Sequence, residues 1–221
     1  MNILNSKKNK IKAILFDFDG VIFDTEPLWF KATINTLKYL KIPYNKKINY
    51  KDQIGINFKA VLDQLLINKI TKKQKNQINK ILNKEFKKIS SKGISTTPFL
   101  KKFLKATNLP FAIVSNSSKN HIINLLQKVK IYKFFNTKNI ISCSGNLKPK
   151  PFPDGYLKGI QILNISPNNI LVIEDSDNGI ESAKKAGIRN ILRYTNQDKN
   201  LSNKIIYKDK KQIKSFKKLL S

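Results

Sequence analysis

Two aspartates separated by one residue stand directly after a short apolar run near the start of the chain. The run covers 13–16, and Asp17, Asp19 and Gly20 follow it. In an extended chain residues i and i+2 point to the same side, so we expect the two carboxylates to share a face. Like charges held that close repel unless a cation lies between them or one carboxyl keeps its proton. The spacing therefore predicts a reactive or cation-binding site, and Gly20 lets the chain turn sharply beside a ligand.

Two later apolar runs also end in polar side chains. Ser115 and Asn116 follow one of them, and Glu174 and Asp175 follow the other. In parallel α/β sheets ligands bind at the carboxyl ends of the strands. We therefore expect these residues to lie near Asp17.

The elements that must position these residues are strands that alternate with helices. The apolar runs that indicate strands are 13–16, 111–114, 140–143, 170–173 and 188–192. Helical segments are expected at 99–107, at 119–129, after Pro153 and at 180–186. Successive βα units favour a parallel sheet covered by helices on both faces, so the predicted fold class is α/β.

A long segment near the N-terminus has a different character. From about residue 25 to 92 the strand-like runs are absent, and apolar residues recur at helical spacing, as in Phe58, Val61, Leu62 and Leu65. This pattern predicts an inserted α-helical cap at 25–92, with a core formed by 1–24 and 93–221.

The composition sets limits on the class of protein. The 221 residues carry a formal net charge of +29, and Cys143 is the single cysteine. A basic surface can bind nucleic acid or steer anionic substrates. The lysines are spread through every segment without an arginine-rich block, which favours a compositional origin of the charge. With no long apolar run for a membrane helix and no disulfide, we expect a cytoplasmic monomer without membrane or nucleic-acid partners.

Four segments in order carry a family resemblance: DFDGVIFDTE, VSNSS, KPFPDGY and VIEDSDNGIESAKKAG. Together they resemble the haloacid dehalogenase superfamily, and the helical insertion resembles the cap of its β-phosphoglucomutase-like branch. Within that branch the chain is most similar to the sugar-phosphate phosphatases that act on 2-deoxyglucose 6-phosphate or hexitol phosphates. The resemblance implies a Rossmann-like core with an inserted helical cap.

The resemblance also implies chemical roles for the acidic residues. Asp17 matches the nucleophile that forms an aspartyl-phosphate, and Asp19 matches the general acid and base. Mg²⁺, which prefers oxygen ligands, would be held by Asp17, the backbone carbonyl of Asp19, and Asp175. Glu174 would assist directly or through water.

The phosphate-binding residues follow in the same way. Ser115, the backbone amide of Asn116 and Lys150 match the groups that hold the phosphate oxygens, and the bare backbone of Gly20 can approach the substrate. Lys148 also precedes a proline and competes with Lys150 for this role. The family lysine precedes Pro-x-Pro-Asp, which favours Lys150.

Residues of the cap and two isolated residues have less specific roles. Trp29 either packs inside the cap or forms a wall over a sugar, and Glu26 either orients the hinge or contacts substrate. His121, the only histidine, is expected to be a surface or helix-capping group, and Cys143 a buried strand residue.

Three functions remain open from the sequence. We expect a Mg²⁺-dependent phosphatase that acts on a small phosphorylated sugar or sugar alcohol. A sugar-phosphate mutase is the alternative, but such mutases have a histidine where this chain has Trp29, and an arginine where it has Ile56 and Asn57 after Gly55. An inactive, basic nucleic-acid-binding protein is the third possibility and rests on charge alone.

Overall fold

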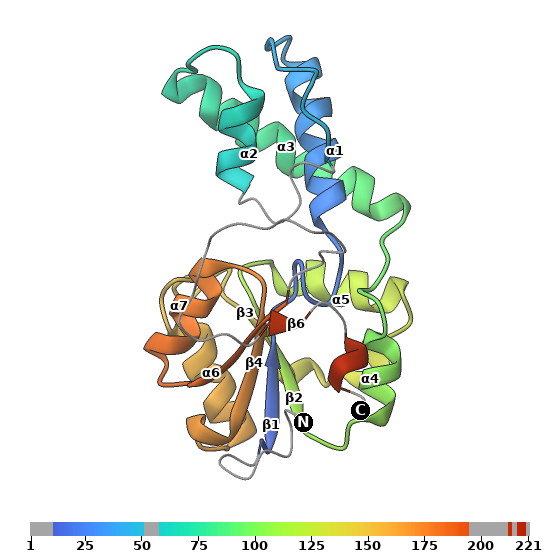
Figure 1. Ribbon diagram of the computed structural model, residues 1–221, viewed down its shortest axis with the longest axis vertical. Coiled ribbons are helices and arrows are strands. Elements are labelled where there is room, and N and C mark those ends of the chain that lie inside the picture. The colour runs from blue at the N-terminus through green and yellow to red at the C-terminus, as the bar shows by residue number, and fades with distance from the viewer. Residues whose placement is uncertain (1–10, 51–57, 195–211, 214–215, 220–221) are drawn as a thin grey trace. The chain divides into compact units, whose positions relative to one another are not determined.

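The chain forms two compact units. The computed structural model describes residues 11–50, 58–194, 212–213 and 216–219 (Figure 1). One unit, called the core unit here, comprises Met1–Phe23 and Ser95–Ser221. The other, called the helical unit, comprises Asp24–Ile94.

A parallel β-sheet forms the centre of the core unit. Its strands are β1 (Ala13–Phe16), β2 (Phe111–Ser115), β3 (Ile140–Ser142), β4 (Ile170–Glu174), β5 (Asn190–Tyr194) and β6 (Gln212–Ile213). The described strands are all parallel and lie in the order β3-β2-β1-β4-β5-β6. This arrangement confirms the predicted α/β class. Because β1 lies between β2 and β4, the residues that follow these three strands meet at one edge of the sheet.

Helices cover both faces of the sheet (Figure 1). They are α4 (Leu100–Ala106), α5 (Lys119–Lys128), α6 (Asp154–Leu163) and α7 (Asp177–Lys185), with short 3-10 helices η3 (Tyr132–Phe134), η4 (Thr137–Asn139), η5 (Pro167–Asn169) and η6 (Phe216–Leu219). Leu15 of β1 packs with Tyr156 of α6 and Ala183 of α7 in one buried cluster. Phe16 points to the opposite face, where its ring meets Phe103 of α4 edge-on, with the ring centroids 6.3 Å apart. Alternate residues of β1 therefore serve opposite faces, as expected for a strand buried on both sides.

Several element boundaries differ from the sequence prediction. The last predicted strand begins at Asn190 instead of residue 188, and the helix expected at 180–186 begins at Asp177. The earlier start follows from Ser176, whose hydroxyl oxygen accepts a hydrogen bond from the Gly179 N–H and caps the helix. The two-residue strand β6 was not predicted, because two residues are too few to show a periodic pattern.

The helical unit contains three described helices. They are α1 (Glu26–Tyr39), α2 (Phe58–Leu65) and α3 (Lys72–Lys92). Helix α3 starts with a capping box, in which Thr71 and Gln74 satisfy each other's backbone N–H groups. Trp29 of α1 stacks face to face on Phe86 of α3, with the ring centroids 3.8 Å apart. None of the helices among the described residues combines the length and hydrophobicity that a membrane crossing requires.

The segments at which the insertion leaves and rejoins the core unit are bonded to each other. Phe23 forms an antiparallel bridge with Thr96. The Thr97 N–H donates to the carbonyl of Ile22 at 3.0 Å, and its hydroxyl donates to the carbonyl of Val21 at 2.6 Å. The core unit is therefore closed by its own hydrogen bonds where the insertion begins and ends.

Candidate active site

A buried lysine joins two carboxylates at the edge of the sheet where β1 and β4 end. The ammonium group of Lys150 lies 2.5 Å from Asp17 Oδ1 and also pairs with Glu174 Oε1. The side chains of Lys150, Asp17 and Glu174 are 5%, 10% and 0% exposed. Charged groups are rarely buried to this extent unless they are paired. The three residues therefore form one electrostatic unit, which the structure assembles from distant parts of the chain.

The loop after β2 helps to place Lys150. Asn116 Oδ1 accepts a hydrogen bond from the Lys150 N–H at 2.9 Å, which fixes the backbone of the lysine against this loop. The competing Lys148 is exposed, and its ammonium group lies over the Phe152 ring, 5.3 Å from the centroid. The geometry thus places Lys150, and not Lys148, beside Asp17.

Burial and mutual charge shift the titration of this group. Burial raises the pKa of Asp17 well above its ordinary value, the charge of Glu174 raises it further, and Lys150 opposes the shift. Burial alone would lower the pKa of Lys150, but the charges of Asp17 and Glu174 more than compensate and raise it. The shift in the pKa of Lys150 favours its charged form.

Glu174 is held by hydrogen bonds on both of its carboxylate oxygens. In addition to Lys150, the Tyr156 hydroxyl donates to Oε1 at 3.0 Å. Oε2 accepts the N–H of Ser176 at 3.1 Å and the hydroxyl of Ser176 at 3.0 Å. A Cβ atom on Gly179 would lie 1.7 Å from Oε1, so only glycine leaves room for the carboxylate. Glu174 is therefore a rigid anchor for Lys150.

The carboxylates present suit a divalent cation. Oxygen atoms of Asp17, Glu174 and Asp175 all lie within 4.8 Å of one another. If all three carboxyl groups are ionised, three negative charges face the single positive charge of Lys150, and two negative charges remain uncompensated. Gly20 has φ +85°, and a Cβ there would lie 1.9 Å from Asp175 Oδ2, so the glycine makes room for this carboxylate. Such a set of oxygen ligands fits Mg²⁺.

Asp19 is connected to the loop after β2 by a second hydrogen-bonded chain. Its Oδ2 accepts a hydrogen bond from the Ser117 hydroxyl at 2.8 Å, and the Ser117 N–H donates to Ser115 Oγ at 2.9 Å. Burial raises the pKa of Asp19, while the hydrogen bond from Ser117 and the charge of His121 act in the opposite direction. Asp19 and the buried Ser115 thus belong to one connected group.

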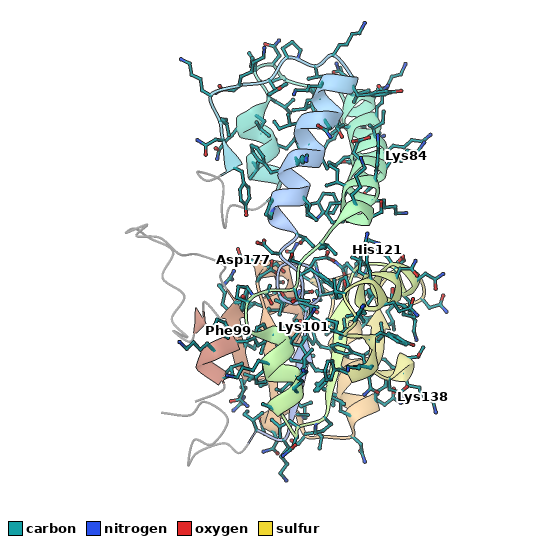
Figure 2. All side chains as sticks on the ribbon, turned by 90° about the vertical axis from the view of Figure 1, so that its right-hand side faces the viewer. Lys84, Phe99, Lys101, His121, Lys138 and Asp177 are labelled. Atoms are coloured by element: carbon teal, nitrogen blue, oxygen red, sulfur yellow. The ribbon has the colours of Figure 1, made fainter. Side chains whose placement is uncertain are left out.

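Several residues of this site had no role assigned from the sequence. His121, which was expected at the surface or at a helix cap, is half-buried in the first turn of α5, and its ring lies edge-on to Phe18, with the centroids 6.5 Å apart. It lies on α5, at the same edge of the core unit as Asp177 (Figure 2). Ser117 and Tyr156 stand inside the motifs VSNSS and KPFPDGY, and that position was the only signal that could have pointed to them.

Two site residues, Trp29 and Glu26, were predicted in the helical unit, and the structure describes the side chain of Trp29. The ring of Trp29 contacts Phe86, which accords with a packing role inside the helical unit. The side chain of Glu26 lies outside the described part of the structure, as do Gly55 and the residues at 56 and 57.

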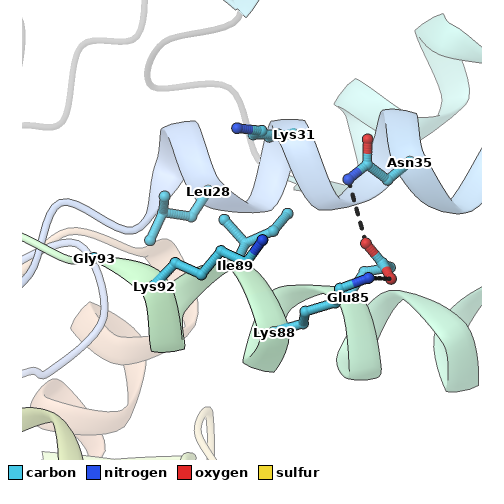
Figure 3. A pocket seen from close by; sticks show the side chains of 8 residues that line it. All are labelled: Leu28, Lys31, Asn35, Glu85, Lys88, Ile89, Lys92 and Gly93. Atoms are coloured by element: carbon cyan, nitrogen blue, oxygen red, sulfur yellow. Dashed lines mark hydrogen bonds and ion pairs between the residues drawn. The ribbon is translucent and has the colours of Figure 1, made fainter.

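The helical unit also has a groove of about 410 Å³ between α1 and α3 (Figure 3). The residues that line it are Leu28, Lys31, Asn35, Glu85, Lys88, Ile89, Lys92 and Gly93. Its carboxylate, Glu85, accepts a hydrogen bond from Asn35 at 3.2 Å and lies 3.8 Å from the ammonium group of Lys88. With a single carboxylate already engaged, the groove lacks the acidic cluster seen at the sheet edge, and we place the candidate active site at the latter.

Comparison with known proteins shows the family of the chain. A family model described as haloacid dehalogenase-like hydrolase matches residues 14–192, which include every member of the acidic cluster. The chain belongs to the haloacid dehalogenase-like hydrolase family. The predicted resemblance is thereby confirmed.

Individual relatives are similar to most of the chain. The chain is 28% identical over 185 residues to a phosphorylated carbohydrates phosphatase of Thermotoga maritima, covering 82% of this chain and 84% of that protein. It is 28% identical over 188 residues to a β-phosphoglucomutase of Bacillus subtilis, covering 80% and 81%. The structure of a family IA, variant 3 hydrolase of Entamoeba histolytica superposes with a TM-score of 0.74 at 24% identity, covering 94% of each chain. That last likeness shows a shared fold.

Proposed function

We propose that this haloacid dehalogenase-like hydrolase is a Mg²⁺-dependent phosphatase that acts on a small phosphorylated sugar or sugar alcohol. The observation that carries the proposal is the buried Asp17–Lys150–Glu174 arrangement, with Asp19 and Asp175 beside it. Phosphoryl transfer requires an in-line nucleophile and fixed positive charge around the equatorial oxygens. The cluster offers a carboxylate for the first requirement and a permanently charged lysine for the second.

The chain's own residues account for both halves of the reaction. An Asp17 carboxylate oxygen attacks phosphorus, the bond to the alcohol breaks, and Asp19 gives its proton to the departing oxygen. Asp19 then takes a proton from a water molecule that attacks the aspartyl-phosphate, which releases inorganic phosphate and restores Asp17. The Ser115 hydroxyl, the Asn116 amide and Lys150 hold the phosphoryl oxygens throughout.

The acidic residues would also hold the cofactor. Asp17, the carbonyl of Asp19, and Asp175 are the proposed Mg²⁺ ligands, and the anchored Glu174 supports them. The ion would neutralise charge that develops on the phosphoryl oxygens.

The substrate class rests on relatives. The Thermotoga maritima protein is named for phosphorylated carbohydrates, and the Bacillus subtilis protein is named as a mutase of phosphoglucose. The name β-phosphoglucomutase keeps a mutase in consideration. Trp29, at a position where the mutases have a histidine, favours the phosphatase.

One experiment separates the two activities. The purified chain is given Mg²⁺ and a panel of sugar and hexitol phosphates that includes β-glucose 1-phosphate, and released phosphate and glucose 6-phosphate are measured together. Asp17→Asn serves as the background control. Phosphate release that requires Mg²⁺ and Asp17 supports the phosphatase, whereas glucose 6-phosphate formation without net phosphate release would establish the mutase.

The positive charge gives little support to a nucleic-acid-binding function. The exposed lysines labelled in Figure 2 come from separate elements, Lys84 from α3, Lys101 from α4 and Lys138 from η4. A dedicated nucleic-acid surface gathers its basic residues on one face or stripe. A salt titration of DNA binding tests this alternative, because phosphate contacts produce a steep salt dependence.

A further inference from the structure

Ser117 occupies a connecting position in the core unit. It lies two residues beyond the end of β2, and its three polar groups each make a hydrogen bond. Its N–H donates to Ser115 Oγ at 2.9 Å, its hydroxyl donates to Asp19 Oδ2 at 2.8 Å, and its carbonyl accepts the Ser142 hydroxyl at 2.8 Å. Ser117 thus joins the loop after β1 to the loop after β2 and to the last residue of β3.

The backbone that carries Asp19 is already fixed. The N–H groups of Ile22 and Phe23 donate to the carbonyl of Phe18 at 3.0 and 3.3 Å, and the Gly20 N–H donates to the carbonyl of Phe23 at 2.9 Å. These bonds close a tight loop but leave the Asp19 side chain free to rotate about its own bonds. Among the described residues, the hydrogen bond that holds its carboxyl group comes from Ser117, 98 positions away.

From this geometry we infer that Ser117 is the positioning residue of Asp19. The inference rests on the proposed phosphatase function. Ser117 holds Oδ2 as an acceptor, so a proton carried by the Asp19 carboxyl resides on Oδ1, which is the oxygen left to give that proton to the departing alcohol. Since the same serine binds Ser115 through its backbone, it also sets the acid at a fixed place relative to a phosphate-binding hydroxyl.

This role predicts a dependence on the leaving group. A sugar or other alkyl phosphate departs as a strongly basic alkoxide and requires the proton from Asp19. The p-nitrophenolate of p-nitrophenyl phosphate is a weak base and departs without a proton. A defect in the placement of the acid therefore slows the first class of substrate and spares the second.

The test compares Ser117→Ala with Ser118→Ala. Ser118 is exposed, and although it begins α5, its side chain makes no capping hydrogen bond, so it is a matched control in the same loop. For each variant kcat/KM is measured with an alkyl phosphate and with p-nitrophenyl phosphate, because kcat/KM reports the steps up to loss of the leaving group. General acid catalysis contributes about 10²–10⁴-fold, and we expect Ser117→Ala to lose about 10-fold or more of the alkyl rate for positioning alone.

The decisive quantity is the ratio of the two kcat/KM values in one preparation. Incorrectly folded protein lowers both values by the same factor, so it does not change the ratio. We expect the alkyl-to-aryl ratio to fall about 10-fold in Ser117→Ala, to stay unchanged in Ser118→Ala, and to recover in Ser117→Thr, which keeps a hydroxyl. An unchanged ratio in Ser117→Ala would overturn the positioning role even if both rates fell. Absence of Mg²⁺-dependent hydrolysis in the unsubstituted chain would overturn the proposed function itself.

Discussion

Replacement of Lys150 by methionine tests the central electrostatic unit. Methionine keeps most of the lysine's volume, including its packing beside the Tyr156 ring, 5.1 Å from the ammonium group. It removes the only cation that pairs with the buried carboxylates of Asp17 and Glu174 among the described residues. Removal of one partner from a buried ion pair costs about 3–5 kcal/mol, because it leaves an uncompensated buried charge. For a chain of this size that corresponds to a fall in Tm of about 6–20 °C.

The assay is urea unfolding followed by far-ultraviolet circular dichroism in EDTA. Lys148→Met is the matched control, because Lys148 is exposed two positions earlier in the same loop. The unfolding free energy of Lys148→Met should stay within about 0.5 kcal/mol of the unsubstituted chain. Lys150→Met should lose more stability at pH 8 than at pH 5, because the buried Asp17 carboxylate, whose pKa is raised, takes up a proton more readily at the lower pH.

Two results would refute this reasoning. The first is an unfolding free energy for Lys150→Met within about 1 kcal/mol of that for Lys148→Met, which is the range of ordinary substitutions. The second comes from adding Asp17→Asn to Lys150→Met. That change removes one of the two unpaired charges and should restore part of the lost stability, so a further loss would contradict the ion-pair account.

Three further predictions concern single residues and the cation. Asp17→Asn should abolish Mg²⁺-dependent phosphate release while the circular dichroism spectrum stays the same, and appreciable residual turnover would contradict the nucleophile assignment. Gly179→Ala should cost about 1–3 kcal/mol by overpacking against Glu174, whereas Gly93→Ala, whose Cβ would meet nothing within 4 Å, should be tolerated in the same unfolding assay. Because the pKa of Asp17 is raised from 3.8 in the folded state, the folded chain keeps a proton that the unfolded chain has lost. The unfolding free energy in EDTA should therefore fall as pH rises from about 3.8 towards the raised pKa of Asp17. The rise in Tm on adding Mg²⁺ should grow over the same pH range. An unfolding free energy that rises with pH in this range would count against the buried position of Asp17.

The sequence was sufficient for the buried strands β1, β2 and β4 and for the order of the motifs. Fully buried parallel strands are short apolar runs, and β1, β2 and β4 each follow this pattern. The adjacency of Asp17 and Glu174 then follows from the parallel arrangement of the strands, since all carboxyl ends lie at one edge. The flanking prolines favoured Lys150 over Lys148, and the structure places Lys150 in the cluster.

The side-chain network could not be predicted in the same way. The hydrogen bond from Ser117 to Asp19 depends on the rotamers and loop conformations of residues far apart in sequence, and no local pattern encodes these. Tyr156 is an aromatic residue at a helix position where packing alone would explain it. Its hydrogen bond to Glu174 therefore left no separate signal in the sequence. His121 looked like a helix-surface residue because helical periodicity does not reveal that Phe18 lies beside it.

The bridge between Phe23 and Thr96 has a consequence for how this fold can vary. Among the described residues, the strand pairings of the sheet involve none of the 71 residues of Asp24–Ile94. A short Gly/Ser connection in their place would have to span only the gap between two already paired backbones. We therefore expect that the length and composition of the segment Asp24–Ile94 can change without shifting the register of the described strands.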